Sequence, residues 1–146
     1  MTTVNIYLTF NGNCEQAFRY YKSVFGGEFT IFSKFKDMPE NPEFPVAESD
    51  MEKVMHVTFP VGKETVLMGS DTGADWAPGF KQGNNFSVSI NTDSKENADR
   101  LFDALSQGGK ITMPMANTFW GSYFGMLTDQ FGIQWMVSFD ISEREK

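Results

Sequence analysis

The sequence has little of the chemistry that builds disulfide and transition-metal sites. Of its 146 residues, one is cysteine and one is histidine. A single cysteine excludes an intrachain disulfide and fits a reducing compartment, so we expect a cytoplasmic protein. No apolar stretch approaches the roughly 18 residues that a membrane-spanning helix needs. The first residues, MTTVNIYLTFNG, lack the basic and apolar segments of a secretory leader. We therefore expect no secreted form and no membrane partner.

Basic residues are also scarce. The chain has 12 lysines and arginines against 19 acids, which gives a net charge of −7. Phosphate binding needs clustered basic residues, and here they are scattered, so a nucleic-acid partner is not expected. The same argument bears on the aromatic stretch FWGSYFGMLTDQFGIQW at 119–135. Such a stretch forms a core, the wall of a ligand pocket or a stacking platform, and a platform usually lies in a basic groove. The first two interpretations remain.

The first half of the chain predicts one helix and four strands. Apolar alternation and β-forming residues place strands at 5–10, 28–35, 54–62 and 64–71. Asn13 is a candidate N-cap for a helix that ends at the glycine pair 26–27. The segment 36–53 carries three prolines and six acids. It is expected to be a solvated loop that serves as a lid or as an arm facing a partner.

The second half repeats this pattern. Strands are expected at 85–92, 110–117, 122–129 and 133–140, with a helix that follows Asp93 or Ser94 and ends at the glycine pair 108–109. The segments GGEFTI and GGKITM match, and Asn5 aligns with Asn85 at an offset of 80 residues.

Each half therefore reads βαβββ. We expect an α+β fold in which two tandem modules complete one curved mixed sheet, with the helices outside and a concave cleft inside. The prediction is a single domain over 1–146, with module 1 at about 4–71, a linker loop at 72–84 and module 2 at about 85–140.

Three segments carry a resemblance to a known family: NGNCEQAFRYYKSVFGG, LMGSD and TFWGSYFGMLTDQFGIQW. With the paired βαβββ modules, they resemble the vicinal-oxygen-chelate superfamily of glyoxalase I, extradiol dioxygenases and the bleomycin- and fosfomycin-resistance proteins. The resemblance is closer to its PhnB-like branch, often labelled a demethylubiquinone methyltransferase domain. It covers about residues 4–140 and implies the fold more strongly than the reaction, because one fold hosts many chemistries.

The resemblance also implies where a catalytic metal would be held. The superfamily uses His and Glu side chains on the first and last strands of each module, and those positions are Asn5, Met68, Asn85 and Met136 here. Two carboxamides and two thioethers are poor ligands for zinc, nickel, iron or manganese. A different register on the first strand brings Tyr7 inward, and the set stays poor. We therefore expect no metal and no other cofactor.

The only histidine, His56, is the candidate catalytic residue. It opens a strand at a place where the PhnB-like branch tends to have one, and its alternatives are a general base in the cleft or a strand histidine bonded to backbone. The expected ligand-cleft residues are Asn5, Tyr7, Met68, Asp71, Asn85, Trp120, Tyr123 and Met136.

Other residues keep structural alternatives. Asp71 suits a turn as well as the mouth of the cleft, and Asp129 is expected to cap a tight turn. Trp120 is placed at the rim of the cleft, while Trp135 packs away from it if Met136 points in. Cys14 is expected to be a small residue at the start of a helix.

Two functions follow. One is a protein that binds a small, partly apolar molecule, as the resistance members of the superfamily do by sequestration. The other is a metal-independent isomerase, lyase or transferase that uses His56 with Tyr7, Tyr123 or Asp71. A methyltransferase is not favoured from the residues, because neither turn from strand to helix is rich in glycine. The resemblance implies a homodimer.

Overall fold

The computed structural model describes residues 2–43, 45–73 and 79–141. The chain forms two compact units, residues 1–81 and 82–146, and each is described by itself. Residues 74–78 of the expected linker lie outside the described residues.

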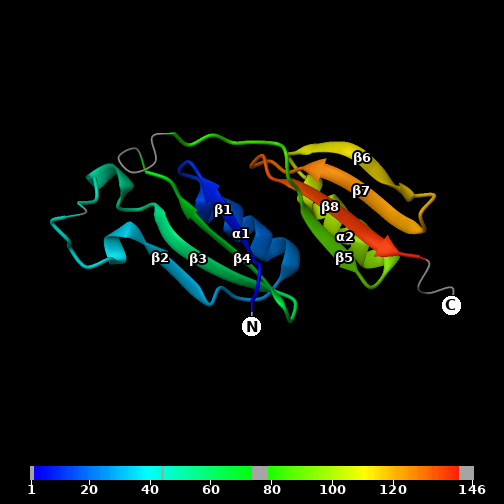
Figure 1. The fold of residues 1–146 in the computed structure, drawn as a ribbon, viewed down its shortest axis with the longest axis horizontal. Coiled ribbons are helices and arrows are strands. Elements are labelled where there is room, and N and C mark those ends of the chain that lie inside the picture. The colour runs from blue at the N-terminus through cyan, green and yellow to red at the C-terminus, as the bar shows by residue number, and fades with distance from the viewer. Residues whose placement is uncertain (1, 44, 74–78, 142–146) are drawn as a thin grey trace. The chain divides into compact units, whose positions relative to one another are not determined.

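Unit 1 is a four-stranded mixed sheet with one helix on one face (Figure 1). Its elements are β1 (Ile6–Phe10), α1 (Cys14–Phe25), β2 (Ile31–Lys34), β3 (Val54–Val61) and β4 (Thr65–Asp71). The strand order is β1-β4-β3-β2. β1 and β4 are parallel, while the β4–β3 and β3–β2 pairs are antiparallel. The long segment 36–53 has two short 3₁₀ turns: η1 (Phe35–Asp37) lies at its start and η2 (Glu48–Asp50) lies within it.

The core of unit 1 lies between α1 and the sheet. The helix presents a buried stripe with the 3.6-residue period, and every second residue of the strands faces it. The buried side chains are Leu8, Phe10, Ala17, Phe18, Tyr21, Val24, Val57, Phe59 and Leu67. Gly69 on β4 lets the ring of Phe18 approach the backbone, because a Cβ at this position would lie 2.6 Å from Cε2 of Phe18.

Unit 2 repeats the arrangement. Its elements are β5 (Val88–Thr92), α2 (Lys95–Ser106), β6 (Lys110–Asn117), β7 (Ser122–Thr128) and β8 (Gln134–Asp140). The strand order is β5-β8-β7-β6, with β5 and β8 parallel. Gly125 on β7 accommodates Phe102 as Gly69 accommodates Phe18. The core is formed by Val88, Ala98, Leu101, Phe102, Leu105, Leu127, Ile133, Trp135 and Val137.

The prediction of two βαβββ modules in an α+β fold is confirmed. β2 and β5 each begin three residues later than expected, at Ile31 and Val88. Ser94 caps α2 as one of the two candidates, since its side chain accepts a hydrogen bond from the backbone N–H of Asn97 at 3.1 Å. The joining of the two sheets around one concave cleft stays a prediction.

Neither helix in the described part of the chain is long and apolar enough to cross a membrane.

Candidate functional site

The face of the first sheet that is turned away from α1 carries two of the polar candidates of unit 1, Tyr7 and His56. Successive side chains of a strand point to opposite faces, and the buried residues Leu8, Leu67 and Val57 mark the helix side. The neighbours of these residues therefore share the other face, which we call the open face of sheet 1. Its central row follows from the strand register, which pairs Tyr7 with Met68 and Met68 with Thr58.

Three side chains on this face form a hydrogen-bonded chain. The Tyr7 hydroxyl lies 3.3 Å from Nδ1 of His56, and Nε2 of the same ring lies 2.8 Å from Oγ1 of Thr58. The Tyr7 and His56 rings are 5.7 Å apart between centroids. Both imidazole nitrogens thus have hydroxyl partners, which fixes the orientation of the ring. The interpretation of His56 as a histidine bonded only to backbone does not hold.

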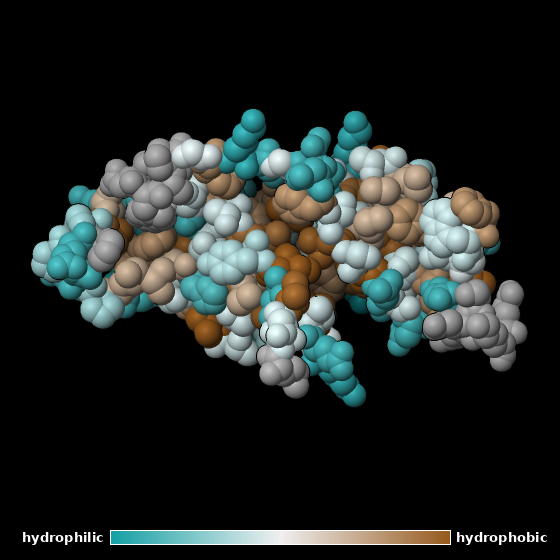
Figure 2. Space-filling model, in the orientation of Figure 1, coloured by the Kyte–Doolittle hydropathy of each residue, from teal (hydrophilic) through white to brown (hydrophobic). Residues whose placement is uncertain are grey.

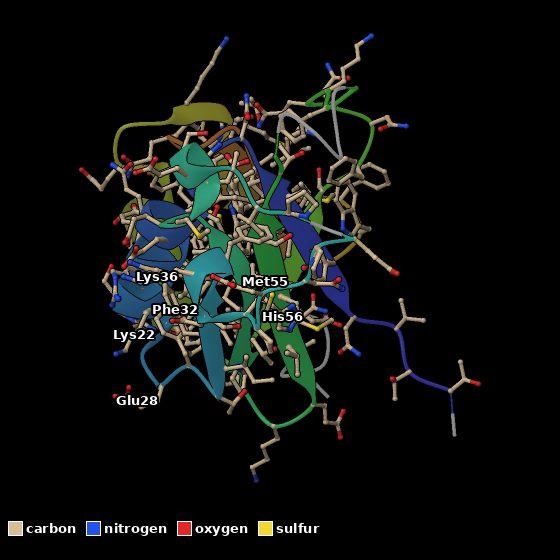
Figure 3. All side chains as sticks on the ribbon, turned by 90° about the vertical axis from the view of Figure 1, so that its left-hand side faces the viewer. Lys22, Glu28, Phe32, Lys36, Met55 and His56 are labelled. Carbon is tan, nitrogen blue, oxygen red and sulfur yellow. The ribbon has the colours of Figure 1, made fainter. Side chains whose placement is uncertain are left out.

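Two methionines, Met55 and Met68, lie next to residues of this hydrogen-bonded chain. The β2–β3 register shifts between Ser33 and Lys34, which leaves Met55 as the extra residue of a β-bulge next to His56. Figure 3 shows Met55 and His56 on one side of these strands and Phe32 on the other, with Lys22 of α1. Thioethers are flexible and polarisable, so they adapt to ligands of different shape.

The corresponding face of the second sheet has a simpler chemistry. The register pairs Ser89 with Met136 and Met136 with Met126. Beside this row, the Ser138 hydroxyl lies 2.7 Å from Oδ1 of Asn91. This open face of sheet 2 presents thioethers and small polar groups.

The register corrects the expected alignment of the two modules. Tyr7 and Ser89 hold equivalent places, because each pairs with the methionine of the last strand of its module. Asn5 and Asn85 instead precede β1 and β5, and both are exposed. The Asn5 amide lies near the Thr3 hydroxyl, at 3.5 Å. The offset of 80 residues was wrong for the strands. Asn5 lies one residue before β1, whereas Asn85 lies three residues before β5.

The place of Asp71 also differs from the expected cleft mouth. Its side chain is 3% exposed. Oδ1 accepts hydrogen bonds from the backbone N–H groups of Gly12, at 3.0 Å, and Cys14, at 2.9 Å. Oδ2 accepts one from Val54 at 2.9 Å. Asp71, at the end of β4, therefore caps α1, while the expected cap, Asn13, makes no side-chain cap bond. A carboxylate with both oxygens occupied in this way serves the fold and is not available to a ligand.

Cys14 lies beside this carboxylate, at the first turn of α1. It is fully buried. Burial, and then the charge of Asp71, raise the pKa of the thiol far above its ordinary value. Since the thiolate is the reactive form, Cys14 is an inert core residue, as expected.

Tyr123 lies on the helix side of the second sheet, which corrects its expected place in the cleft. Its hydroxyl donates a hydrogen bond to Oδ1 of Asp99 on α2 at 2.5 Å. The Lys95 ammonium lies 4.9 Å from the centre of its ring. Strand alternation gives Phe124 and Met126 the open face instead. The parity of this strand could not be fixed from its sequence because aromatic residues occur on both faces.

The hydrogen bond to Asp99 first, then desolvation, raise the pKa of Tyr123 to about 12. A phenol whose pKa is higher in the folded state than in the unfolded chain stabilises the fold below the unfolded pKa of about 10. That contribution is lost as the pH rises from about 10 to 12. We expect Tyr123→Phe to lower stability at pH 8 and to weaken this alkaline loss. Urea unfolding of both proteins at a series of pH values measures it. Identical pH profiles would contradict the expectation.

Trp120 lies in the turn between β6 and β7, next to Phe119. The two side chains are 57% and 97% exposed, and their rings are 5.0 Å apart. Figure 2 shows apolar and weakly polar atoms over this turn. The indole also lies 6.0 Å from the ring of Phe124, on the open face of sheet 2. Its predicted place at the rim of a cleft depends on both modules and stays a prediction.

The segment 36–53 encloses a hollow of its own. Its volume is about 360 Å³. Apolar and proline side chains dominate the lining, with the full set being Phe35, Lys36, Met38, Pro39, Glu40, Asn41, Pro42, Pro45, Val46 and Met51. The segment is thus partly structured, which its acid and proline content did not indicate.

The residues at the superfamily's metal positions do not fit a metal. The resemblance implies Met68 and Met136 on the last strands, and the register places Tyr7 and Ser89 beside them, in place of the expected Asn5 and Asn85. A phenol, a hydroxyl and two thioethers lack the imidazole, carboxylate or thiolate that first-row transition metals require. Among the described residues, no group of three or more His, Cys, Asp and Glu side chains is placed to hold an ion.

Thr58 is the site residue that sequence reasoning missed. A signal was available, because Thr58 follows His56 by two residues in a strand and so shares its face. Tyr7, in contrast, reaches His56 across 49 residues of sequence.

Paired βαβββ modules of this topology form the vicinal-oxygen-chelate fold. A solved glyoxalase/bleomycin resistance protein/dioxygenase family enzyme from Burkholderia phytofirmans PsJN shares this fold, with a TM-score of 0.60. It is 15% identical, and the match covers 92% of this chain and 96% of that one. The chain belongs to the family described as 3-demethylubiquinone-9 3-methyltransferase, whose model matches residues 2–138.

Two relatives are more similar in sequence. Protein YjdN of Escherichia coli K12 is 30% identical over 139 residues, which cover 90% of this chain and 91% of YjdN. The crystal structure of protein PA1353 from Pseudomonas aeruginosa is 39% identical, with a TM-score of 0.84. That match covers 96% of this chain and 98% of PA1353. The similarity therefore extends over both modules.

Proposed function

We propose that this protein binds a small, partly apolar molecule without a metal ion, and that the open face of sheet 1 is its main contact. The observation that carries the proposal is the chain of Tyr7, His56 and Thr58 on a face that also holds methionines. Ligand sites commonly combine apolar walls with a few fixed polar groups. In this proposal Met68, which the register pairs with Tyr7, supplies apolar contact.

The proposal includes the absence of a catalytic metal and of any other cofactor. It is supported by the donor set at the metal positions, which offers a phenol, a hydroxyl and two thioethers. Metal analysis of stringently purified protein is expected to give far less than one ion per chain. A value near one ion per chain would contradict it.

A second candidate is a metal-independent enzyme, an isomerase, lyase or transferase, in which His56 acts as a base. The observation in its favour is that hydroxyl groups at both ring nitrogens hold the imidazole in one orientation, as a positioned base requires. The family's description names a methyltransferase. The turn before α1 and the turn before α2 both lack the glycine-rich sequence that usually binds a methyl donor.

Native mass spectrometry of the purified protein followed by a turnover assay separates these candidates. We expect a co-purifying small molecule, and a loss of about two- to tenfold in its affinity with His56→Ala, the worth of one hydrogen bond. Thr9→Ala is the matched control, because Thr9 lies on the open face of sheet 1 but outside the hydrogen-bonded chain of Tyr7, His56 and Thr58. Unaltered binding by His56→Ala would refute the site. Conversion of excess molecule, with a rate that falls in His56→Ala, would favour the enzyme.

We further propose a homodimer in the cytoplasm. Exposed aromatic side chains at the β6–β7 turn support self-association, because large exposed apolar groups often mark interfaces. Light scattering is expected to give twice the mass of 16.5 kDa.

A further inference from the structure

We infer that the chain of Tyr7, His56 and Thr58 has one direction, which makes the Tyr7 phenol oxygen a hydrogen-bond acceptor for the bound molecule. The ligand is then an apolar compound that carries a hydroxyl or N–H group. This inference rests on the proposed binding function of the open face of sheet 1 and specifies the chemistry of its ligand.

A neutral imidazole has one N–H donor and one acceptor nitrogen, so two directions are possible. In the first, the Tyr7 O–H donates to Nδ1 of His56, and Nε2–H donates to Oγ1 of Thr58. In the second, the Thr58 O–H donates to Nε2, and Nδ1–H donates to the Tyr7 oxygen. The distance of 2.8 Å at Nε2 suits either donor, and the distance of 3.3 Å at Nδ1 is long for either, so the distances do not distinguish the two directions. The partners decide between them.

The chemistry of the two hydroxyls favours the first direction. A phenol is a far stronger acid than an aliphatic alcohol and hence the better donor to an imidazole lone pair. Its oxygen is the weaker acceptor, because one lone pair is delocalised into the ring. The alcohol of Thr58 is the better acceptor. The neutral imidazole therefore accepts a hydrogen bond from the phenol O–H at Nδ1 and donates one from Nε2–H to Thr58.

The direction decides what the ligand meets. Tyr7 is 47% exposed, whereas His56 and Thr58 are half-buried behind it. Since the Tyr7 O–H is engaged with His56, the exposed phenol oxygen offers a lone pair and no proton. Met68, paired with Tyr7 in the register, supplies the apolar surface beside it. Thr58 is a positioning residue, because it acts only by holding His56 in one tautomer.

The tautomer can be measured directly, because His56 is the only histidine. Nitrogen-15 NMR of the neutral protein is expected to show Nε2 protonated and Nδ1 free of a proton. Thr58→Val removes the acceptor for Nε2–H and is expected to raise the share of the Nδ1–H form. Thr58→Ser and the same-face control Thr9→Val are expected to leave it unchanged. A predominant Nδ1–H form in the unaltered protein would overturn the inference.

The ligand chemistry is tested with p-cresol and 4-methylanisole, which differ by the O–H donor. We expect p-cresol to shift the His56 resonances and to bind about two- to tenfold more tightly, the worth of one hydrogen bond. Equal binding of the two compounds would overturn donor recognition and leave the binding function intact. No shift with either compound would overturn the binding function at this face, and the tautomer would remain a separate test of the chain's direction.

Discussion

Replacing Asp71 by alanine is expected to lower the free energy of unfolding by about 3–5 kcal/mol. The carboxylate accepts hydrogen bonds from the backbone N–H groups of Gly12, Cys14 and Val54. Alanine leaves these donors without their acceptor at a site that is almost closed to water, and each unpaired buried donor costs about 1–3 kcal/mol. The effects are less than additive because the three donors share one carboxylate. Urea unfolding followed by circular dichroism measures the change.

Asp71→Asn separates the hydrogen bonds from the packing. The amide keeps one acceptor oxygen but turns an NH₂ group toward either Val54 or the pair of Gly12 and Cys14, so we expect a loss of roughly 2 kcal/mol. Glu64→Gln, at an exposed acid in the turn before β4, is the control and is expected to stay within about 0.5 kcal/mol of the unaltered protein. An Asp71→Ala protein as stable as this control would show that Asp71 does not hold the start of α1.

The second large effect is expected at Trp135. Its side chain is 1% exposed, and its indole N–H donates a hydrogen bond to Oδ2 of Asp129 at 2.8 Å. Oδ1 of Asp129 accepts hydrogen bonds from the backbone N–H groups of Phe131 and Ile133, so this carboxylate caps the β7–β8 turn as expected. Through Oδ2 it also holds the buried indole of Trp135. Trp135→Ala removes the largest fully buried side chain and a partner of Asp129. We expect a loss of about 3–5 kcal/mol.

Trp120→Ala, measured at a protein concentration low enough to keep the chain monomeric, is the matched control, because it removes the same side chain from an exposed position. We expect it to change stability by no more than about 0.5 kcal/mol. Trp135→Phe keeps an aromatic ring but loses the N–H group, and should fall between the two. The comparison fails if Trp135→Ala and Trp120→Ala unfold at the same urea concentration.

Functional consequences also follow from Asp71 and Tyr123. Both were candidates for the cleft, and both instead hold a helix against its sheet, at Cys14 and at Asp99. Loss of ligand binding in variants at these residues would therefore reflect loss of the fold. The variants that report on the proposed site are those at Tyr7, His56 and Thr58.

Local sequence patterns predicted the two modules and most of their strands. Alternation and helical stripes are local patterns, and they placed α1, α2 and the four strands of each unit within a few residues. They also predicted that Trp135 packs in the core on the face opposite Met136, which the structure confirms. Local patterns suffice here because burial repeats with the period of each element.

Contacts between side chains that are distant in the sequence depend on the tertiary structure. Asp71 caps a helix that starts 57 residues earlier in the sequence, in place of the adjacent Asn13. The strand register pairs Tyr7, and not Asn5, with Met68, and so brings a phenol to the only histidine. Periodicity states which residues share a face of one strand. It does not predict the register between neighbouring strands, because backbone pairing and core packing between distant segments set that register.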